Sequence, residues 1–147
     1  MTVAYIRTYT NRQSAEEQKT VISNYATSQL IKIDMWYTDY ENTSSSHHEL
    51  ENIIRDLNSG DQLIVSDSGQ LGKKLAEVMH YILLCIEHNI TLYCLHEGYT
   101  FRNDIDSKTL AFTFGLISEI EKKANSLTIG FSYISFSTNI QETVIEN

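Results

Sequence analysis

Two apolar runs decide the fold: Gln62-Leu63-Ile64-Val65-Ser66 and Ile90-Thr91-Leu92-Tyr93-Cys94-Leu95. Both runs are short, apolar and rich in β-branched residues, which is typical of buried strands. Between them apolar residues recur at helical spacing, and this pattern ends near Asn89. The stripe consists of Leu71, Leu75, Val78, Met79, Ile82, Leu83 and Ile86. The stretch therefore predicts a strand, a helix and a second strand that runs parallel to the first.

The same alternation extends to both ends of the chain. Residues 2–6 form a short apolar run, and apolar and polar residues alternate over 31–37, so both segments are predicted strands. Ser14 and Glu17 form a capping box at the start of one helix, and Leu50 to Leu57 shows helical spacing. A last helix is expected from Asp104–Ser107 onward. We expect an α/β fold with a mostly parallel sheet of four to five strands, helices on both faces and a long C-terminal helix.

Composition limits the classes of function. The 147 residues, 41% of them hydrophobic, suffice for one domain with a core, and no apolar run approaches a membrane span. Cys85 and Cys94 lie inside apolar segments and fit small buried hydrophobes in a reducing cytoplasm. The chain has 11 Lys+Arg against 19 Asp+Glu, a net charge of −8. Because DNA affinity comes largely from basic residues, this balance predicts weak or absent DNA binding and favours a protein partner.

Several motifs occur in series along the chain. Tyr5-Ile6-Arg7-Thr8-Tyr9-Thr10 is followed by two glutamines, Gln13 and Gln18; Gly60 to Val65 is followed by Gln70-Leu71-Gly72-Lys73; and Glu121-Lys122 falls in the last helix. Over residues 3 to 124 this series resembles the catalytic domain of the serine recombinases, the resolvase/invertase family. The resemblance predicts a degenerate catalytic domain over residues 1–128. Residues 129–147 would then be a short acidic tail with no DNA-binding domain.

The resemblance also implies a site and its chemistry. Members of the family cut DNA by attack of a serine hydroxyl on a phosphodiester that arginines surround. The positions that match this site are Arg7, Tyr9, Gln13, Gln18, Gln70, Lys73 and Lys122. Tyr9 holds the nucleophile's position, Gln70 carries no charge, and a lysine such as Lys73 lacks the two-pronged donor geometry of arginine. We therefore expect a catalytically inactive domain that acts as a regulator through protein contacts.

The last helix is the candidate contact surface, because the resemblance implies that it packs against a second copy. Its apolar stripe consists of Leu110, Phe114, Ile117, Ile120 and Ala124. The same stripe would fit an ordinary core-facing helix, but Phe112 lies off it and suggests a helix with two apolar sides. We expect a homodimer, or a heterodimer with a related recombinase.

Two alternatives use the same residues differently. The chain could be an active recombinase or nuclease that attacks through Tyr9, with DNA binding supplied by a partner. It could instead be a nucleotide-binding α/β module, since Gly69-Gln70-Leu71-Gly72-Lys73-Lys74 lies between a strand and a helix. That segment lacks the spacing of a P-loop. The histidines show no ligand spacing, so neither a metal nor a cofactor is expected.

Overall fold

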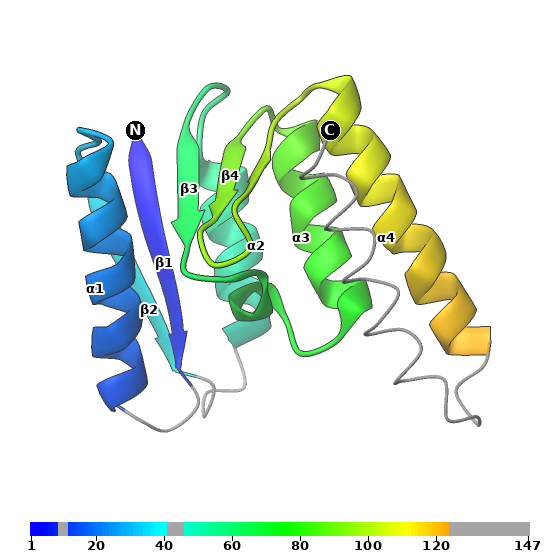
Figure 1. The fold of residues 1–147 in the computed structure, drawn as a ribbon, viewed down its shortest axis with the longest axis horizontal. Helices are drawn as coiled ribbons and strands as arrows, with labels where there is room; N and C mark the ends of the chain where they lie inside the picture. The colour runs from blue at the N-terminus through cyan, green and yellow to red at the C-terminus, as the bar shows by residue number, and fades with distance from the viewer. Residues whose placement is uncertain (9–11, 41–45, 124–147) are drawn as a thin grey trace.

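The structure is a computed structural model that describes residues 1–8, 12–40 and 46–123. Strands and helices alternate along these residues (Figure 1). In chain order the elements are β1 (Thr2–Thr8), α1 (Arg12–Ser28), β2 (Met35–Tyr40), α2 (Ser46–Asp56), β3 (Gln62–Val65), the short 3-10 helix η1 (Ser68–Leu71), α3 (Leu75–Glu87), β4 (Thr91–Cys94), β5 (Tyr99–Phe101) and α4 (Ile105–Lys123). None of these helices is long and apolar enough to cross a bilayer.

The strands form one five-stranded sheet in the order β2-β1-β3-β4-β5. The pairs β1–β2, β1–β3 and β3–β4 are parallel, and only β5 runs antiparallel, beside β4. The prediction of a mostly parallel sheet with helices on both faces is confirmed.

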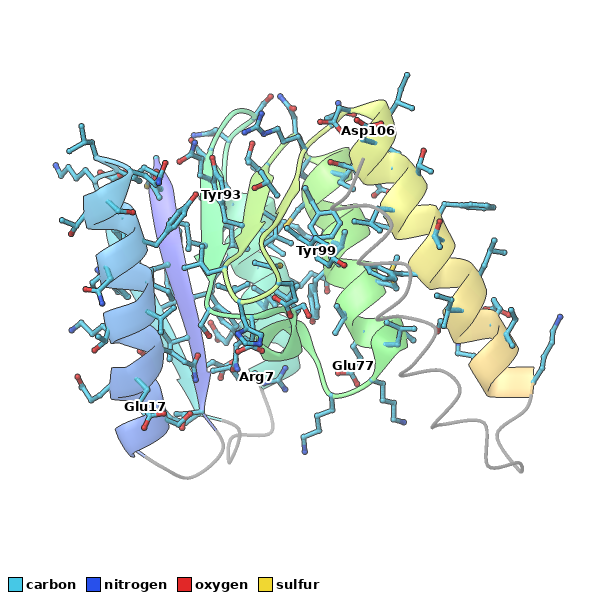
Figure 2. The ribbon with its side chains drawn as sticks, viewed as in Figure 1. Arg7, Glu17, Glu77, Tyr93, Tyr99 and Asp106 are labelled. Carbon is cyan, nitrogen blue, oxygen red and sulfur yellow. The ribbon has the colours of Figure 1, made fainter. Side chains whose placement is uncertain are left out.

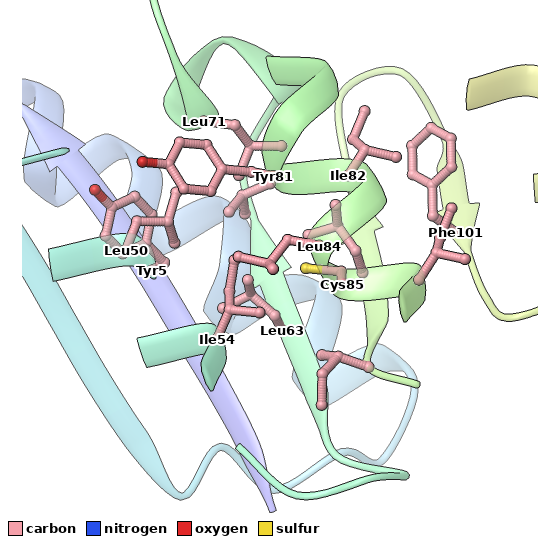
Figure 3. Close-up of a cluster of buried hydrophobic side chains, with 14 of the residues drawn as sticks. Tyr5, Leu50, Ile54, Leu63, Leu71, Tyr81, Ile82, Leu84, Cys85 and Phe101 are labelled. Atoms are coloured by element: carbon pink, nitrogen blue, oxygen red, sulfur yellow. The ribbon is translucent and has the colours of Figure 1, made fainter. Parts of the chain in front are cut away.

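The alternation of side chains along β1 divides the core into two clusters. Ala4 and Ile6 face α1, where Ile22 packs against them. Val3 and Tyr5 face the opposite side, in the larger cluster that α2 and α3 cover (Figure 3). The last helix, α4, packs against α3 and contributes the buried Ala111. Two apolar layers thus hold the sheet between α1 and the other three helices.

Several predicted boundaries were wrong. The second strand begins at Met35 rather than Ile31, and α1 already includes Arg12, so Ser14 lies inside the helix instead of capping it. The third helix begins at Leu75, after the separate η1 turn that holds Leu71. Strand β5 was not predicted.

The sheet divides at its carboxyl edge. Strand β1 pairs with β2 as far as Thr8, but its pairing with β3 ends at Ala4. The order in which strands join the sheet also reverses here, because β2 lies on one side of β1 and β3 lies on the other. In open α/β sheets such a switch point, at the carboxyl ends of the strands, is where ligands usually bind.

Candidate functional site

Arg7 lies near the end of β1 on the face that α2 and α3 cover. Its side chain is only 2% exposed, and its partner in the register of β2 is Asp39, 7% exposed. The hydroxyl of Tyr5 donates a hydrogen bond of 2.9 Å to Oδ2 of Asp39. Burial, and then the Asp39 carboxylate, raise the pKa of the Tyr5 phenol, so it remains a protonated donor. The guanidinium of Arg7 therefore belongs to a buried polar cluster and is not presented on the surface.

Gln18 holds the backbone of Arg7 from α1. Its Nε2 donates to the carbonyl oxygen of Arg7 at 2.8 Å, and its Oε1 accepts the Arg7 N–H at 3.3 Å. The amide thus takes the place of a strand partner beyond the last β1–β3 pair, at Ala4. The side chain is 7% exposed and both ends of its amide are used by the protein. Gln18 positions β1, and its amide is not directed at an external group.

Gln70 is held within the loop that follows β3. Its Nε2 donates to Oδ2 of Asp67 at 3.1 Å, and the hydroxyl of Ser66 donates to the same oxygen at 3.2 Å. The next residue, Ser68, donates its N–H and its hydroxyl to the Glu97 carboxylate, the latter at 2.6 Å. These bonds fix η1 against the loop after β4.

A polar hollow of about 320 Å³ lies between α1 and the loops that follow β3 and β4. Its lining consists of Ser14, Glu17, Gln18, Val21, Ser66, Asp67, Gln70, Leu95 and His96. Two carboxylates, those of Glu17 and Asp67, face this space, and the described lining includes neither lysine nor arginine. A phosphate placed here would meet like charge, which opposes its binding.

A second, basic cavity of about 580 Å³ lies beyond η1, where the start of α3 approaches the end of α4. It is lined by Ser68, Gly69, Gly72, Lys73, Lys74, Leu75, Ala76, Val78, Ser118 and Lys122. The three lysines supply positive charge, and no carboxylate belongs to the described lining. In Figure 2, Arg7, Glu17 and Glu77 mark the end of the molecule toward which the strands point, whereas Asp106 marks the opposite end.

The structure therefore separates the residues that sequence placed in one site. Gln18 and Gln70 border the polar hollow, Lys73 and Lys122 border the basic cavity, and Arg7 is inside the protein. Tyr9 lies outside the described residues, and so does the side chain of Gln13, whose backbone belongs to α1.

Sequence reasoning missed three residues of this region: Asp39, Asp67 and Ser118. Asp39 follows an alternating apolar segment, and an acidic residue at the end of a parallel strand is a usable signal of a site. The other two carry no comparable sequence signal, because a loop aspartate and a helical serine are usually solvent-exposed.

The predicted contact stripe on α4 lies on different sides of the helix. Ile117 is buried, and Leu110 and Phe114 pack against the larger core cluster, whereas Ile120 is 59% exposed. Ala124 lies outside the described residues. The exposed side of α4 instead carries Phe112 and Leu116, four residues apart and 66% and 50% exposed.

The cysteines are not candidate nucleophiles. Cys85 and Cys94 are fully buried free thiols, and burial raises the pKa of Cys85 to about 12. A protonated thiol is a poor nucleophile. Within the described part of the chain, no group of three or more His, Cys, Asp or Glu side chains could hold a metal ion.

Comparison with known proteins gives one family and one fold. Residues 2–128 match the family model of the resolvase N-terminal domain. No curated protein sequence is significantly similar to the chain. A resolvase family site-specific recombinase from Streptococcus pneumoniae is similar in structure, with a TM-score of 0.68, 19% identity and 97% of both chains covered.

Two further solved structures are similar. The N-terminal catalytic domain of TP901-1 integrase has a TM-score of 0.65 and 16% identity over 83% of this chain and 96% of its own. The C-terminal catalytic domain of ISC1926 TnpA, an IS607-like serine recombinase, has a TM-score of 0.52 and 16% identity, with 97% of both chains covered.

Proposed function

Because the chain belongs to the resolvase N-terminal domain family, whose structural neighbours are serine recombinase catalytic domains, we propose that it is a serine recombinase-like domain that does not cleave DNA and acts through protein contacts. Its partner is a second copy of the chain, and α4 supplies the contact. The main observation behind this proposal is the exposed apolar face of α4, which consists of Phe112, Leu116 and Ile120.

The distribution of charge supports a loss of cleavage. Phosphoryl transfer depends on cations that converge on the phosphate oxygens as charge develops there. Here the charge of Arg7 is inside the protein, and the neutral Gln70 is bonded to Asp67. The lysines lie in another cavity, and the polar hollow between them and α1 contains carboxylates. A single phosphate at the end of β1 would lack the convergent cations that the reaction requires.

The exposed face of α4 supports the protein contact. Phe112, Leu116 and Ile120 follow each other at four-residue intervals, so they form one continuous apolar stripe. Thr109 and Thr113 lie on the same face, and their hydroxyls already donate to backbone carbonyls one turn earlier, at 2.8 and 2.9 Å. A partner can therefore cover this face without leaving a hydroxyl unsatisfied.

A second copy is the occupant that fits this face. In a two-fold dimer the same patch meets itself, which an uncharged stripe permits. Lys108 and Glu119 border the stripe near opposite ends of α4 and are both exposed. An antiparallel pair of α4 helices would place the lysine of one copy near the glutamate of the other, which favours this arrangement over a parallel one.

Sedimentation velocity of the purified chain tests the contact. We expect a dimer at micromolar concentration and a monomer for Leu116→Glu, which introduces a charge at the centre of the stripe. Leu83→Glu is the matched control, because Leu83 is a 41% exposed leucine on α3 and should leave the dimer intact. A monomeric wild-type chain, or equal loss in both variants, would contradict the dimer. A monomer that associates only with an active recombinase would replace it with a mixed dimer.

Incubation with supercoiled DNA tests the loss of cleavage. We expect neither nicked product nor a covalent protein–DNA adduct. An adduct that disappears in Tyr9→Phe would overturn this part of the proposal and establish attack by the phenol.

A further inference from the structure

The basic cavity collects positive charge in a chain that is otherwise acidic. Lys73, Lys74 and Lys122 line it, three of only 11 Lys+Arg in a chain of net charge −8. Among the described residues, the one ion pair of Lys122 is a long, exposed contact with Glu119 at 3.9 Å, so most of its charge remains available to an anion. We propose that this cavity binds a free, compact oligophosphate, of the kind carried by a nucleotide, rather than the backbone of DNA.

The start of α3 supplies backbone donors to the same cavity. Leu75 and Ala76 form the first turn of this 13-residue helix and line the cavity. Within the described structure their N–H groups make no hydrogen bond, and the side chain of Lys74, which precedes the helix, does not cap them. Two such donors at the positive end of a helix favour a bound anion.

The chain around Gly72 brings these donors to the wall of the cavity. A Cβ at Gly72 would lie 2.4 Å from the Cβ of Glu77, so only glycine allows this approach. Glu77 Oε2 accepts the N–H of Lys73 at 3.1 Å, which holds the turn in place and occupies one donor of the segment. The donors left for a ligand are those of Leu75 and Ala76.

Ser118 supplies an independent observation from the opposite wall. It lines the cavity from α4, it is only 7% exposed, and its hydroxyl makes none of the hydrogen bonds found in the described structure. The hydroxyl borders the open space of the cavity, where an anionic oxygen would accept a hydrogen bond from it.

Size and surroundings limit the ligand to a compact one. A volume of about 580 Å³ exceeds that of one phosphate and suits several linked phosphates. On the other side of η1 lie the carboxylates of Glu17 and Asp67 in the polar hollow, and Glu97 is bonded to Ser68. A DNA strand that continued past the cavity would meet these charges, whereas a ligand contained in the cavity would not.

Calorimetric titration with inorganic triphosphate tests the proposal. We expect one molecule bound per chain, with affinity reduced about tenfold or more in Lys74→Gln, since each charge-assisted hydrogen bond contributes at least that factor. Ser118→Val should weaken binding without a change in charge. Lys32→Gln is the matched control, because Lys32 is an exposed lysine between α1 and β2 that does not line the cavity.

Titration with a short duplex DNA at the same phosphate concentration separates the two sources of phosphate. Weaker binding of the duplex than of triphosphate is expected. No heat with triphosphate, or an equal loss in Lys32→Gln and Lys74→Gln, would overturn the site. Tighter binding of the duplex that Lys74→Gln abolishes would make the cavity a DNA site and also overturn the proposal. These titrations do not depend on the α4 contact.

Discussion

The buried cluster around Arg7 and the basic cavity lie at the same edge of the sheet, yet they use charge in opposite ways. The inward group, which consists of Tyr5, Arg7, Gln18 and Asp39, is at most 7% exposed; Tyr5 bonds to Asp39, and Gln18 bonds to the backbone of Arg7. Lys73 and Lys74 of the basic cavity are exposed. Substitutions in the inward group should therefore change stability, and those in the cavity should change only binding.

Asp39→Ala should give the largest effect. It leaves the buried hydroxyl of Tyr5 without its acceptor and removes the buried carboxylate that lies opposite Arg7 in the register of β1 and β2. We expect the free energy of unfolding to fall by about 3 kcal/mol, measured by urea denaturation. Asp39→Asn, which can still accept the hydrogen bond, should lose less. An unchanged midpoint in Asp39→Ala would show that the cluster is not structural.

Gln18→Ala should have the next largest effect. It removes the partner of the Arg7 carbonyl and of the Arg7 N–H, both inside the protein. The expected loss is about 2 kcal/mol of unfolding free energy. Gln29→Ala, at an exposed position after α1, is the control and should change stability by less than about 0.5 kcal/mol. Equal stability of the two variants would be evidence that the Gln18 amide is dispensable.

Alkaline pH should weaken the interior. Burial raises the pKa of Cys85 to about 12 and also raises the pKa of Tyr5. The folded chain therefore keeps protons that the unfolded chain releases. The contribution of these groups to the free energy of unfolding is fully present below about pH 8.5 and is lost as the pH rises above it. At about pH 9 this loss should be smaller than that of Gln18→Ala. Urea denaturation at several pH values measures it, and Cys85→Ala should reduce the slope.

Removing the cavity's charge should have the smallest effect. For Lys73→Gln combined with Lys122→Gln we expect a stability within about 0.5 kcal/mol of the wild type, because both side chains are exposed. Thermal unfolding monitored by circular dichroism suffices to detect a larger change. A marked loss would indicate that these lysines hold α3 and α4 together and would remove the contrast with the inward group.

The fold was largely predictable from the sequence, because its signals are local. Apolar runs at strand spacing and the α3 stripe identify the parallel sheet, since each pattern has one structural period. Strand β5 was missed because it has only three residues, Tyr99–Phe101. Strand β2 was placed too early because Ile31 and Ile33 pack on the α1 side of the core before pairing with β1 begins.

The candidate site was less predictable, because its properties depend on which way side chains point. Spacing places Gln18 near Arg7 but cannot show that its amide binds backbone. The α4 helix carries two apolar sides, and sequence cannot tell which one the core takes; Phe112 was the only hint of the second. The division into a polar hollow and a basic cavity depends on η1, a turn of four residues without periodicity.

The Tyr5–Asp39 hydrogen bond also has a consequence for strand alignment. The backbone hydrogen bonds between parallel strands do not by themselves select one alignment, and a slip of one residue moves every side chain to the other face. If β2 slipped in this way, Asp39 would turn toward Ala4, Ile6 and Ile22, where an unpaired carboxylate would be buried among hydrocarbon. The buried acid thus excludes the neighbouring alignment, and a polar residue at the edge of a site specifies how the whole sheet is assembled.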